Sequence, residues 1–330
     1  MDWTGIRVLV TGADGFIGSH LTESLVELGA SVRAFCLYNP LGSAGWLDYA
    51  PAAVRDAIDV RLGDIRDARF TAEACEGIDT VFHLAALIAI PYSYRAPESF
   101  LDTNAKGTLN MLEAARKAGC RRFVHTSTSE VYGTPASLPI RETHPLQGQS
   151  PYSASKIAAD KLCEAYYCSF NLPAVTVRPF NTYGPRQSAR AVIPTILSQL
   201  LAGQTTVKLG RLDPRRDLTF VRDTVRAFML AGAAAGVEGQ VIQLGTGRAV
   251  SVGELFDFAC SALGVVAVAE CDAQRLRPDA SEVMVLQADP SKARTLLGWE
   301  AEVPLEEGLR LTADWLMRHR HLYRPGQYQL

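Results

Sequence analysis

The sequence predicts an α/β fold built on a parallel, doubly wound β-sheet. Short β-rich runs alternate with longer helical patterns between residues 6 and 178, which is typical of β-α-β units. The first of these runs leads directly into a glycine-rich turn and a helix. With 330 residues, 48% of them hydrophobic and 21% charged, the chain has the composition of a globular protein that is long enough for two domains.

Charge and cysteine usage argue against several classes of protein. The net charge of -2 and the lack of a basic block argue against nucleic-acid binding. The start has no signal-peptide pattern, and apolar runs such as 81–90 are too short to span a bilayer. Seven scattered cysteines without a CxxC pair fit reduced thiols better than disulfides or a metal site. We therefore expect a cytoplasmic protein without metal, membrane or nucleic-acid partners.

The first predicted strand, residues 6–11, ends at the glycine turn GADGFIG, and a helical pattern follows. In this context the glycines allow a tight turn and a close approach of the backbone to a pyrophosphate, which the helix N-terminus faces. The sequence therefore predicts a dinucleotide-binding turn at Gly12, Gly15, Phe16, Ile17 and Gly18.

The second predicted strand, residues 31–35, lacks the usual acid at its end. Such an acid binds the adenosine ribose, but this chain has Cys36 there, and its next acid is Asp48. Nor does an arginine follow the strand to hold a 2′-phosphate, since Arg33 lies within it. The sequence favours NAD without excluding NADP, and Asn39 or Ser43 could contact the ribose.

Further strands are predicted at 58–62, 80–84, 122–126 and 174–178, with long helices near 98–118 and 151–170. Strands over 218–221 and 241–244 are expected to return to the same domain. Right-handed crossovers make such a sheet parallel, and ligands bind beyond the carboxyl ends of its strands. Gly12, Asp64, Ala85 and Thr128 all follow strands, so four segments are expected to converge on one ligand site.

Residues 126–156 carry the side chains best suited to proton transfer. Tyr152 and Lys156 are four residues apart on a predicted helix and therefore lie on one face, one turn from each other. We expect the ammonium of Lys156 to lower the pKa of the Tyr152 phenol. The preceding Thr128-Ser129-Glu130 run adds a carboxylate as a second proton acceptor.

Taken together, the glycine turn, Asp64-Ile65, LAA (84–86), TSTSEVYG, YSASK, RPFNTYGPR and RRDLTFV resemble the extended short-chain dehydrogenase/reductase family. The resemblance implies a Rossmann domain (1–178 plus 217–245) and a smaller C-terminal α/β domain that binds a nucleotide-sugar (179–216 plus 246–330). It also implies a homodimer formed through the helices near 98–118 and 151–170. Ile65, Leu84 and Ala86 join Asp64, Ala85, Tyr152 and Lys156 in the expected cofactor site.

Within this family, Thr128-Ser129-Glu130 resembles the corresponding run of nucleotide-sugar 4,6-dehydratases. Other stretches are similar to the N-acetylglucosamine-nucleotide 4,6-dehydratases of legionaminic-acid-type pathways. UDP-glucuronate decarboxylases can also carry Thr-Ser-Glu, whereas 4-epimerases generally have neutral residues at the position of Glu130. A decarboxylase, a nucleotide-sugar 4-epimerase and a catalytically silent nucleotide-binding protein are the alternatives.

The resemblance implies oxidation of the sugar at C4, loss of water across C5 and C6, and return of the hydride to C6. Tyr152 would take the proton of the 4-hydroxyl, and Glu130 the proton at C5, while Thr128 would bind the 4-oxygen. Ser129 replaces the Asp that protonates the leaving hydroxyl in related enzymes and is a poorer acid. The residues expected to bind the substrate are Ser93, Asn181, Arg190, Arg216 and Arg277.

Overall fold

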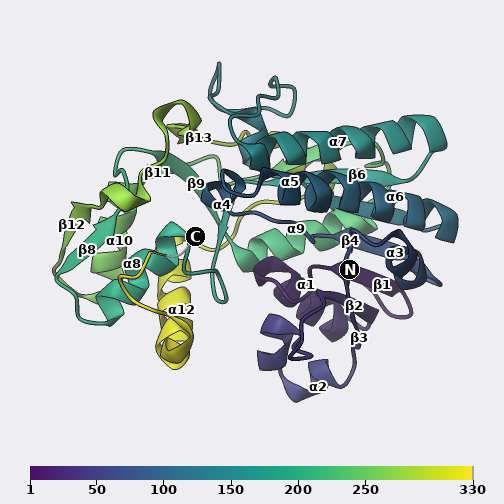
Figure 1. Ribbon diagram of the computed structural model, residues 1–330, viewed down its shortest axis with the longest axis horizontal. Coiled ribbons are helices and arrows are strands. Elements are labelled where there is room, and N and C mark those ends of the chain that lie inside the picture. Colours follow the sequence, from purple (N-terminus) through teal and green to yellow (C-terminus); the bar gives the residue numbers. More distant parts are fainter. Residues whose placement is uncertain (329–330) are drawn as a thin grey trace.

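The computed structural model describes residues 1–328, and its main layer is a seven-stranded sheet (Figure 1). All neighbouring strands in this sheet run parallel, which confirms the predicted α/β fold of Rossmann type. The strands, in their order across the sheet, are β10 (Val241–Leu244), β6 (Ala174–Pro179), β5 (Arg122–Thr126), β4 (Thr80–His83), β1 (Arg7–Thr11), β2 (Ser31–Leu37) and β3 (Asp59–Gly63).

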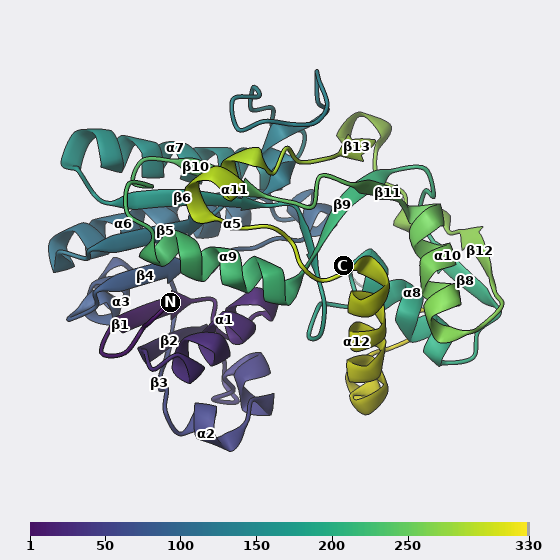
Figure 2. The same ribbon diagram turned by 180° about the vertical axis from the view of Figure 1, so that it is seen from behind.

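Helices cover both faces of this sheet because successive strand residues point to opposite sides. Val8 and Val10 of β1 pack into one hydrophobic core, whereas Leu9 packs into another. The first core lies under α1 (Phe16–Glu27) and α9 (Val221–Ala233), which is best seen in Figure 2. The second lies under α3 (Ala68–Cys75), α6 (Gly107–Ala118) and α7 (Pro151–Phe170).

The helix predicted near 98–118 consists of three consecutive segments. It starts as α5 (Pro97–Phe100), continues as a π-helix, η2 (Leu101–Lys106), and ends as α6. The helix predicted at 151–170 is α7, which begins at Pro151 after a reciprocal pair of hydrogen bonds between Ser150 and Ser153. In Figure 1, α6 and α7 run side by side across the sheet.

A second region holds two smaller sheets. The first contains β11 (Ala249–Ser251), β9 (Arg215–Phe220) and β13 (Val285–Leu286), with β7 (Asn181–Tyr183) pairing to β9. The other joins β12 (Val268–Cys271) to β8 (Thr206–Leu209), beside α8 (Val192–Leu201), α10 (Val252–Leu263) and α12 (Leu305–Arg318). The remaining α-helices are the short α2 (Ala52–Arg55), α4 (Ile90–Ser93) and α11 (Ser291–Leu297).

The prediction of a strand at 218–221 that returns to the main domain is wrong in both its bounds and its sheet. Strand β9 begins at Arg215 and joins the smaller sheet, whereas Val221 already opens α9. The buried Asp217 gives a physical reason, because its carboxylate accepts hydrogen bonds from the amides of Thr246, Gly247 and Ala288. The strand expected at 241–244 is β10, and it does return to the main sheet beside β6.

Two contacts connect α1 to the loop that follows β7. Arg186 Nη2 and Glu23 Oε1 form an ion pair of 2.6 Å, and both side chains are largely buried. His20 Nε2 is 3.0 Å from the carbonyl oxygen of Pro185. These contacts hold the nucleotide-side helix against the segment that leads into the second region. Within residues 1–328, no helix is long and apolar enough to cross a membrane.

Candidate active site

The glycine turn and the loop after β4 touch through their backbones. Gly12 has a φ of 68°, and a Cβ there would lie 2.8 Å from the amide nitrogen of Ala85. Thr11 Oγ1 fixes the same approach, since it accepts hydrogen bonds of 3.1 Å from the amides of both Leu84 and Ala85. A side chain at Gly12 would therefore displace the neighbouring loop, which explains the glycine at this position.

The other predicted cofactor residues lie at the same edge of the sheet. Gly15 is the N-cap of α1, Phe16 and Ile17 open that helix, and a Cβ on Gly18 would lie 2.1 Å from the Gly12 carbonyl oxygen. This turn at a helix N-terminus fits the pyrophosphate of a dinucleotide. Asp64, Ile65 and Ala86 likewise follow the ends of β3 and β4.

Asp64 is held in place by its neighbour. Arg66 Nη2 forms an ion pair of 2.5 Å with Asp64 Oδ2, and the hydrogen bonds from Arg66 hold the carboxyl pKa below its usual value. Ile65 is buried, and a Cβ on Gly107 would come within 2.6 Å of its Cδ1. Helix α6 therefore packs directly on the segment that carries Asp64.

Thr128, Glu130 and Tyr152 come together beyond the end of β5. Thr128 is the N-cap of a 3₁₀ helix, η3 (Ser129–Tyr132), and its Oγ1 accepts a hydrogen bond of 3.2 Å from the Glu130 amide. Burial, with the nearby Glu130 charge, raises the pKa of the Tyr152 phenol, whereas the Thr128 side chain beside it acts to lower this pKa. Ser129 is 3% exposed and therefore points into the protein.

The pKa of Tyr152 differs from the prediction. Burial raises it above the ordinary value for a phenol, and Lys156 does not counter this effect. The phenol ring packs edge-on against Phe100, at 6.2 Å between centroids, in a cluster of apolar side chains that disfavours the phenolate. Lys156 Nζ instead donates a hydrogen bond of 2.6 Å to the carbonyl of Thr126.

Asn104, in the π-helix, connects two of the predicted loops and was not identified from the sequence. Its Nδ2 donates to Ser155 Oγ at 2.9 Å, and its side-chain amide exchanges hydrogen bonds with the backbone of Leu87. The loop after β4 is thereby fixed to α7 between Tyr152 and Lys156. A polar Asn within an amphipathic helix was the available signal, and π-helical turns are frequent at functional sites.

A buried polar network lies one helical turn beyond Lys156. Asp160 accepts hydrogen bonds from Ser127 Oγ at 2.8 Å and Arg178 Nε at 3.0 Å, and it is 3.2 Å from His125 Nε2. Burial acts to raise the Asp160 pKa, but His125 and Arg178 outweigh this and lower it. Sequence reasoning missed this network because its members come from three separate segments.

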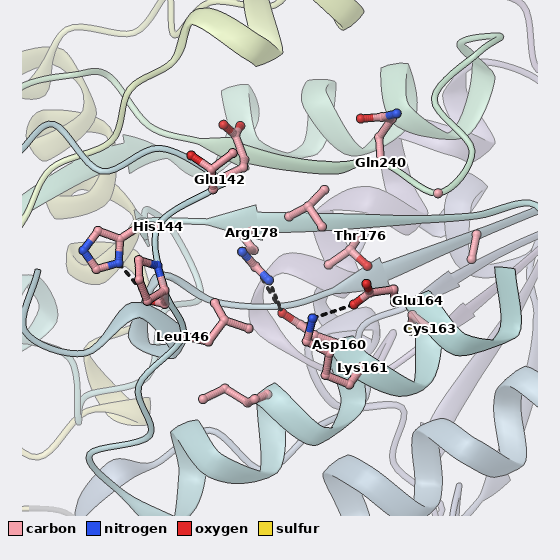
Figure 3. A pocket seen from close by; sticks show the side chains of 16 residues that line it. Glu142, His144, Leu146, Asp160, Lys161, Cys163, Glu164, Thr176, Arg178 and Gln240 are labelled. Atoms are coloured by element: carbon pink, nitrogen blue, oxygen red, sulfur yellow. Dashed lines mark hydrogen bonds and ion pairs between the residues drawn. The ribbon is translucent and has the colours of Figure 1, made fainter. Parts of the chain in front are cut away.

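Asp160 and Arg178 also border a cavity of about 590 Å³ between α7, β6 and the segment 142–146. Figure 3 shows the two side chains facing each other there, with Glu142, His144 and Gln240 around them. Thr128, Glu130 and Tyr152 do not line this cavity. It is therefore a separate hollow on the other side of the buried network.

The second region brings two of the predicted substrate arginines to one carboxylate. Arg216 Nη2 is 3.1 Å from Glu282 Oε1, and Arg277 Nη1 is 3.8 Å from the same oxygen. Glu282, whose side chain is 10% exposed, was not identified from the sequence. Asn181 lies in β7 beside β9, and its Oδ1 is buried without a hydrogen-bond partner among the described residues.

The remaining two predicted substrate residues are placed differently. Ser93 is completely buried at the end of α4, and its hydroxyl donates a hydrogen bond of 2.7 Å to the carbonyl of Ile90. Arg190 is exposed in the loop before α8, where its Nε donates to Ser188 Oγ at 3.1 Å. The structure therefore groups Arg216 and Arg277 closely but leaves Ser93 facing the protein interior.

Comparisons with known proteins show the family of this chain. Residues 9–312 match the family model described as GDP-mannose 4,6 dehydratase. The chain is 37% identical to a UDP-glucose 4-epimerase of Mycolicibacterium smegmatis, covering 94% of this chain and 98% of that protein. It is 33% identical to a dTDP-glucose 4,6-dehydratase of Streptomyces niveus, with 97% of this chain and 95% of that protein covered.

A solved structure extends the comparison to the fold. The dTDP-glucose 4,6-dehydratase DesIV of Streptomyces venezuelae, crystallised with NAD bound, superposes with a TM-score of 0.86 at 30% identity. The match covers 96% of this chain and 99% of DesIV. The NAD in that crystal agrees with the predicted cofactor. This chain belongs to the GDP-mannose 4,6-dehydratase family of extended short-chain dehydrogenases/reductases.

Proposed function

We propose that this protein is an NAD-dependent nucleotide-sugar 4,6-dehydratase. The observation that carries the proposal is the half-buried side chain of Glu130 near the Tyr152 phenol, with the Glu130 backbone amide fixed by a hydrogen bond to Thr128. A redox step alone needs one proton acceptor, whereas an elimination that follows it needs a second. The family match and the dehydratase relatives support this reading. The product would be a 4-keto-6-deoxy sugar made from a nucleotide hexose or N-acetylglucosamine.

Each of these residues would have a separate role in proton transfer or hydrogen bonding. Tyr152 takes the proton of the sugar 4-hydroxyl, and Thr128 donates a hydrogen bond to the 4-oxygen as charge develops there. Bound NAD supplies a hydride acceptor and donor, with a positive charge that favours the Tyr152 phenolate. Glu130 then removes the proton at C5. Because Ser129 is buried, Glu130 itself passes that proton to the departing 6-hydroxyl.

The nucleotide diphosphate would bind in the second region. Arg216 and Arg277 present guanidinium groups from β9 and the segment before β13, and such groups can each bind two phosphate oxygens. Asn181 would donate from its Nδ2 to a phosphate oxygen, while its Oδ1, which has no protein partner among the described residues, is left to accept from a sugar hydroxyl. Arg190 would reach the phosphates from the loop before α8, whereas the buried hydroxyl of Ser93 would act only by holding the end of α4.

The test is Glu130→Gln, which keeps the size of the side chain and removes its basicity. We expect retained NAD binding and C4 oxidation, seen as reduced nicotinamide, but no 4-keto-6-deoxy product. Glu164→Gln is the matched control, because this exposed glutamate on α7 forms a surface ion pair with Lys161. Formation of the deoxy product by Glu130→Gln at a near wild-type rate would contradict the proposal.

A 4-epimerase is the second candidate, favoured by the 37% identity to a UDP-glucose 4-epimerase. The two activities differ at C5, because only the dehydratase breaks the bond between that carbon and its hydrogen. Turnover in D₂O with several nucleotide-sugars separates them by mass spectrometry. Deuterium at C5 with loss of water indicates the dehydratase, and an unlabelled isomer indicates the epimerase. Release of carbon dioxide from UDP-glucuronate would indicate the decarboxylase.

We also propose that two copies pair through η2, α6 and α7. These helices expose apolar side chains that a partner would cover, namely Leu101, Leu109, Tyr167 and Phe170. Analytical ultracentrifugation should give a dimer for the wild-type protein and a monomer for Leu109→Glu. Val266→Glu, which alters an apolar residue exposed elsewhere, should remain dimeric. Dimers of Leu109→Glu at wild-type stability would contradict the pairing.

A further inference from the structure

The end of β2 has no carboxylate for the ribose of a dinucleotide. Cys36, at the position where an acid usually stands, is completely buried, and the next residue is Leu37. The glycine turn at the N-terminus of α1 fits the pyrophosphate of a dinucleotide at this edge of the sheet, and a solved relative was crystallised with NAD bound. The two ribose hydroxyls therefore need an acceptor from another part of the chain.

Asn39 and Ser43, the two residues suggested by the sequence, are both engaged within their own loop. The Asn39 amide donates to the carbonyls of Leu37 and Ser43, and its oxygen accepts from the amides of Leu41 and Ser43. The Ser43 hydroxyl donates a hydrogen bond of 2.6 Å to Asp48 Oδ2. These side chains shape the loop and have little capacity left for a ligand.

The carboxylate of Asp14 lies beside the end of β2 instead. Its Oδ2 accepts a 3.4 Å contact from the Leu37 amide, and its carbonyl accepts a hydrogen bond of 3.0 Å from the Trp46 amide. A Cβ on Gly45 would come within 2.8 Å of the Asp14 Cβ. Burial and the Asp14 charge together raise the pKa of the Cys36 thiol to about 12. The Asp14 carboxylate thus lies next to Cys36, the position at which a dinucleotide-binding sheet usually has an acid.

This carboxylate has most of its hydrogen-bonding capacity free. A carboxylate can accept about four hydrogen bonds, and a contact of 3.4 Å from Leu37 is long for one of them. A pair of neighbouring ribose hydroxyls supplies two donors. We propose that Asp14, from within the glycine turn, binds the adenosine ribose hydroxyls of NAD and so replaces the missing acid at the end of β2.

The same carboxylate makes the site selective against NADP. A 2′-phosphate would meet the negative charge of Asp14, with that of Asp48 nearby in the loop. Residues 36–50 contain neither arginine nor lysine. Arg33 is bound to Asp59 and the carbonyls of Ala74 and Glu76, and Arg55 donates to the Asp48 carbonyl. A phosphate there would therefore face like charge without a cation to balance it.

The test compares ADP with 2′-deoxy-ADP on the nucleotide-free protein by calorimetry. Wild-type protein should bind ADP roughly tenfold more tightly or better, as expected for a hydrogen bond to a charged group. Asp14→Ala should bind the two ligands alike. Asp56→Asn, which removes an exposed charge at the end of α2, should keep the wild-type ratio. An unchanged ratio in Asp14→Ala would overturn the proposal.

A second measurement uses NAD and NADP on the same proteins. The preference for NAD should fall at least tenfold in both Asp14→Ala and Asp14→Asn, while thermal melting confirms that each variant is folded. The double variant Asp14→Ser with Cys36→Asp should recover the ADP preference by moving the acid to the strand end. If both single variants keep the full preference for NAD, Asp14 does not set it. No sugar is present, so these results are independent of the proposed dehydratase activity.

Discussion

The two halves of the candidate active site differ in how their polar groups are satisfied. On the cofactor side, Thr11 and the glycine turn hold the loops through hydrogen bonds within the protein. On the substrate side, Asn181 Oδ1 and Arg277 Nη1 are buried without a hydrogen-bond partner among the described residues. Buried polar groups normally have partners. The first half is therefore shaped mainly by backbone packing, whereas the second holds a donor and an acceptor that make no hydrogen bond within residues 1–328 and that a nucleotide-sugar can use.

The largest expected effect lies where the two halves meet, at Tyr152. Tyr152→Phe removes the proton acceptor for the sugar hydroxyl, and we expect kcat to fall by about 10² to 10⁴-fold. NAD binding should persist, since the ring and its packing against Phe100 remain. Steady-state turnover and cofactor titration measure the two quantities. Tyr167→Phe, on the same helix but partly exposed, is the control. A fall in kcat of less than tenfold in Tyr152→Phe would show that the phenol is not the proton acceptor.

The second prediction concerns the buried network around Asp160, which supports the cofactor side. Asp160→Asn leaves Arg178 buried without a countercharge, so we expect a loss of about 3–5 kcal/mol in the free energy of unfolding. Urea denaturation measures it. The exposed pair Arg69–Glu73 gives the comparison, because Glu73→Gln should cost at most about 1 kcal/mol. Equal losses in the two variants would mean that the buried network gives no special support.

The third prediction concerns the substrate side. Arg216→Met should raise the KM for the nucleotide-sugar roughly tenfold to a hundredfold, as expected when a charged hydrogen-bond donor is lost. The affinity for NAD should stay unchanged. Arg121→Met is the control and should alter neither quantity. This exposed arginine precedes the start of β5, at the opposite end of the strand from Thr128. A changed NAD affinity with an unchanged KM would reverse the assignment of the two halves.

The last prediction concerns the contact between α1 and the second region. Burial, with the charge of Arg186, lowers the pKa of His20 to about 4, well below the usual 6.5. The unfolded chain therefore binds a proton first, and stability falls as the pH drops from 6.5 towards 4, by up to about 1.4 kcal/mol per pH unit. His20→Gln should flatten this part of a plot of melting temperature against pH. An unchanged slope in His20→Gln would show that His20 does not cause this pH dependence of stability.

What could be predicted from the sequence followed from local rules. Gly12 and the neighbouring loops were predictable because a strand, a glycine turn and a helix specify one backbone geometry. Asp160 and Glu282 were not, since Asp160 pairs with His125 and Arg178 on separate strands and Glu282 pairs with Arg216, 66 residues away, and only the folded chain brings them together. Spacing alone placed Tyr152 near Lys156 but could not give the burial that raises the phenol pKa. Strand β9 was misassigned because the contacts of Asp217 are long-range.

The π-helix η2 limits how the length of this chain can vary. It fits more residues into each turn than an α-helix, which advances about 100° per residue. Deleting one residue between 101 and 106 would restore the α-helical form and leave α5 and α6 nearly in phase, because the wider π-helical turn absorbs the extra residue. The side chains within the segment would be reoriented, and Asn104 would lose the geometry of its contacts with Leu87 and Ser155. A change of one residue in this helix is therefore a change in the active site, although no side chain of the site is replaced.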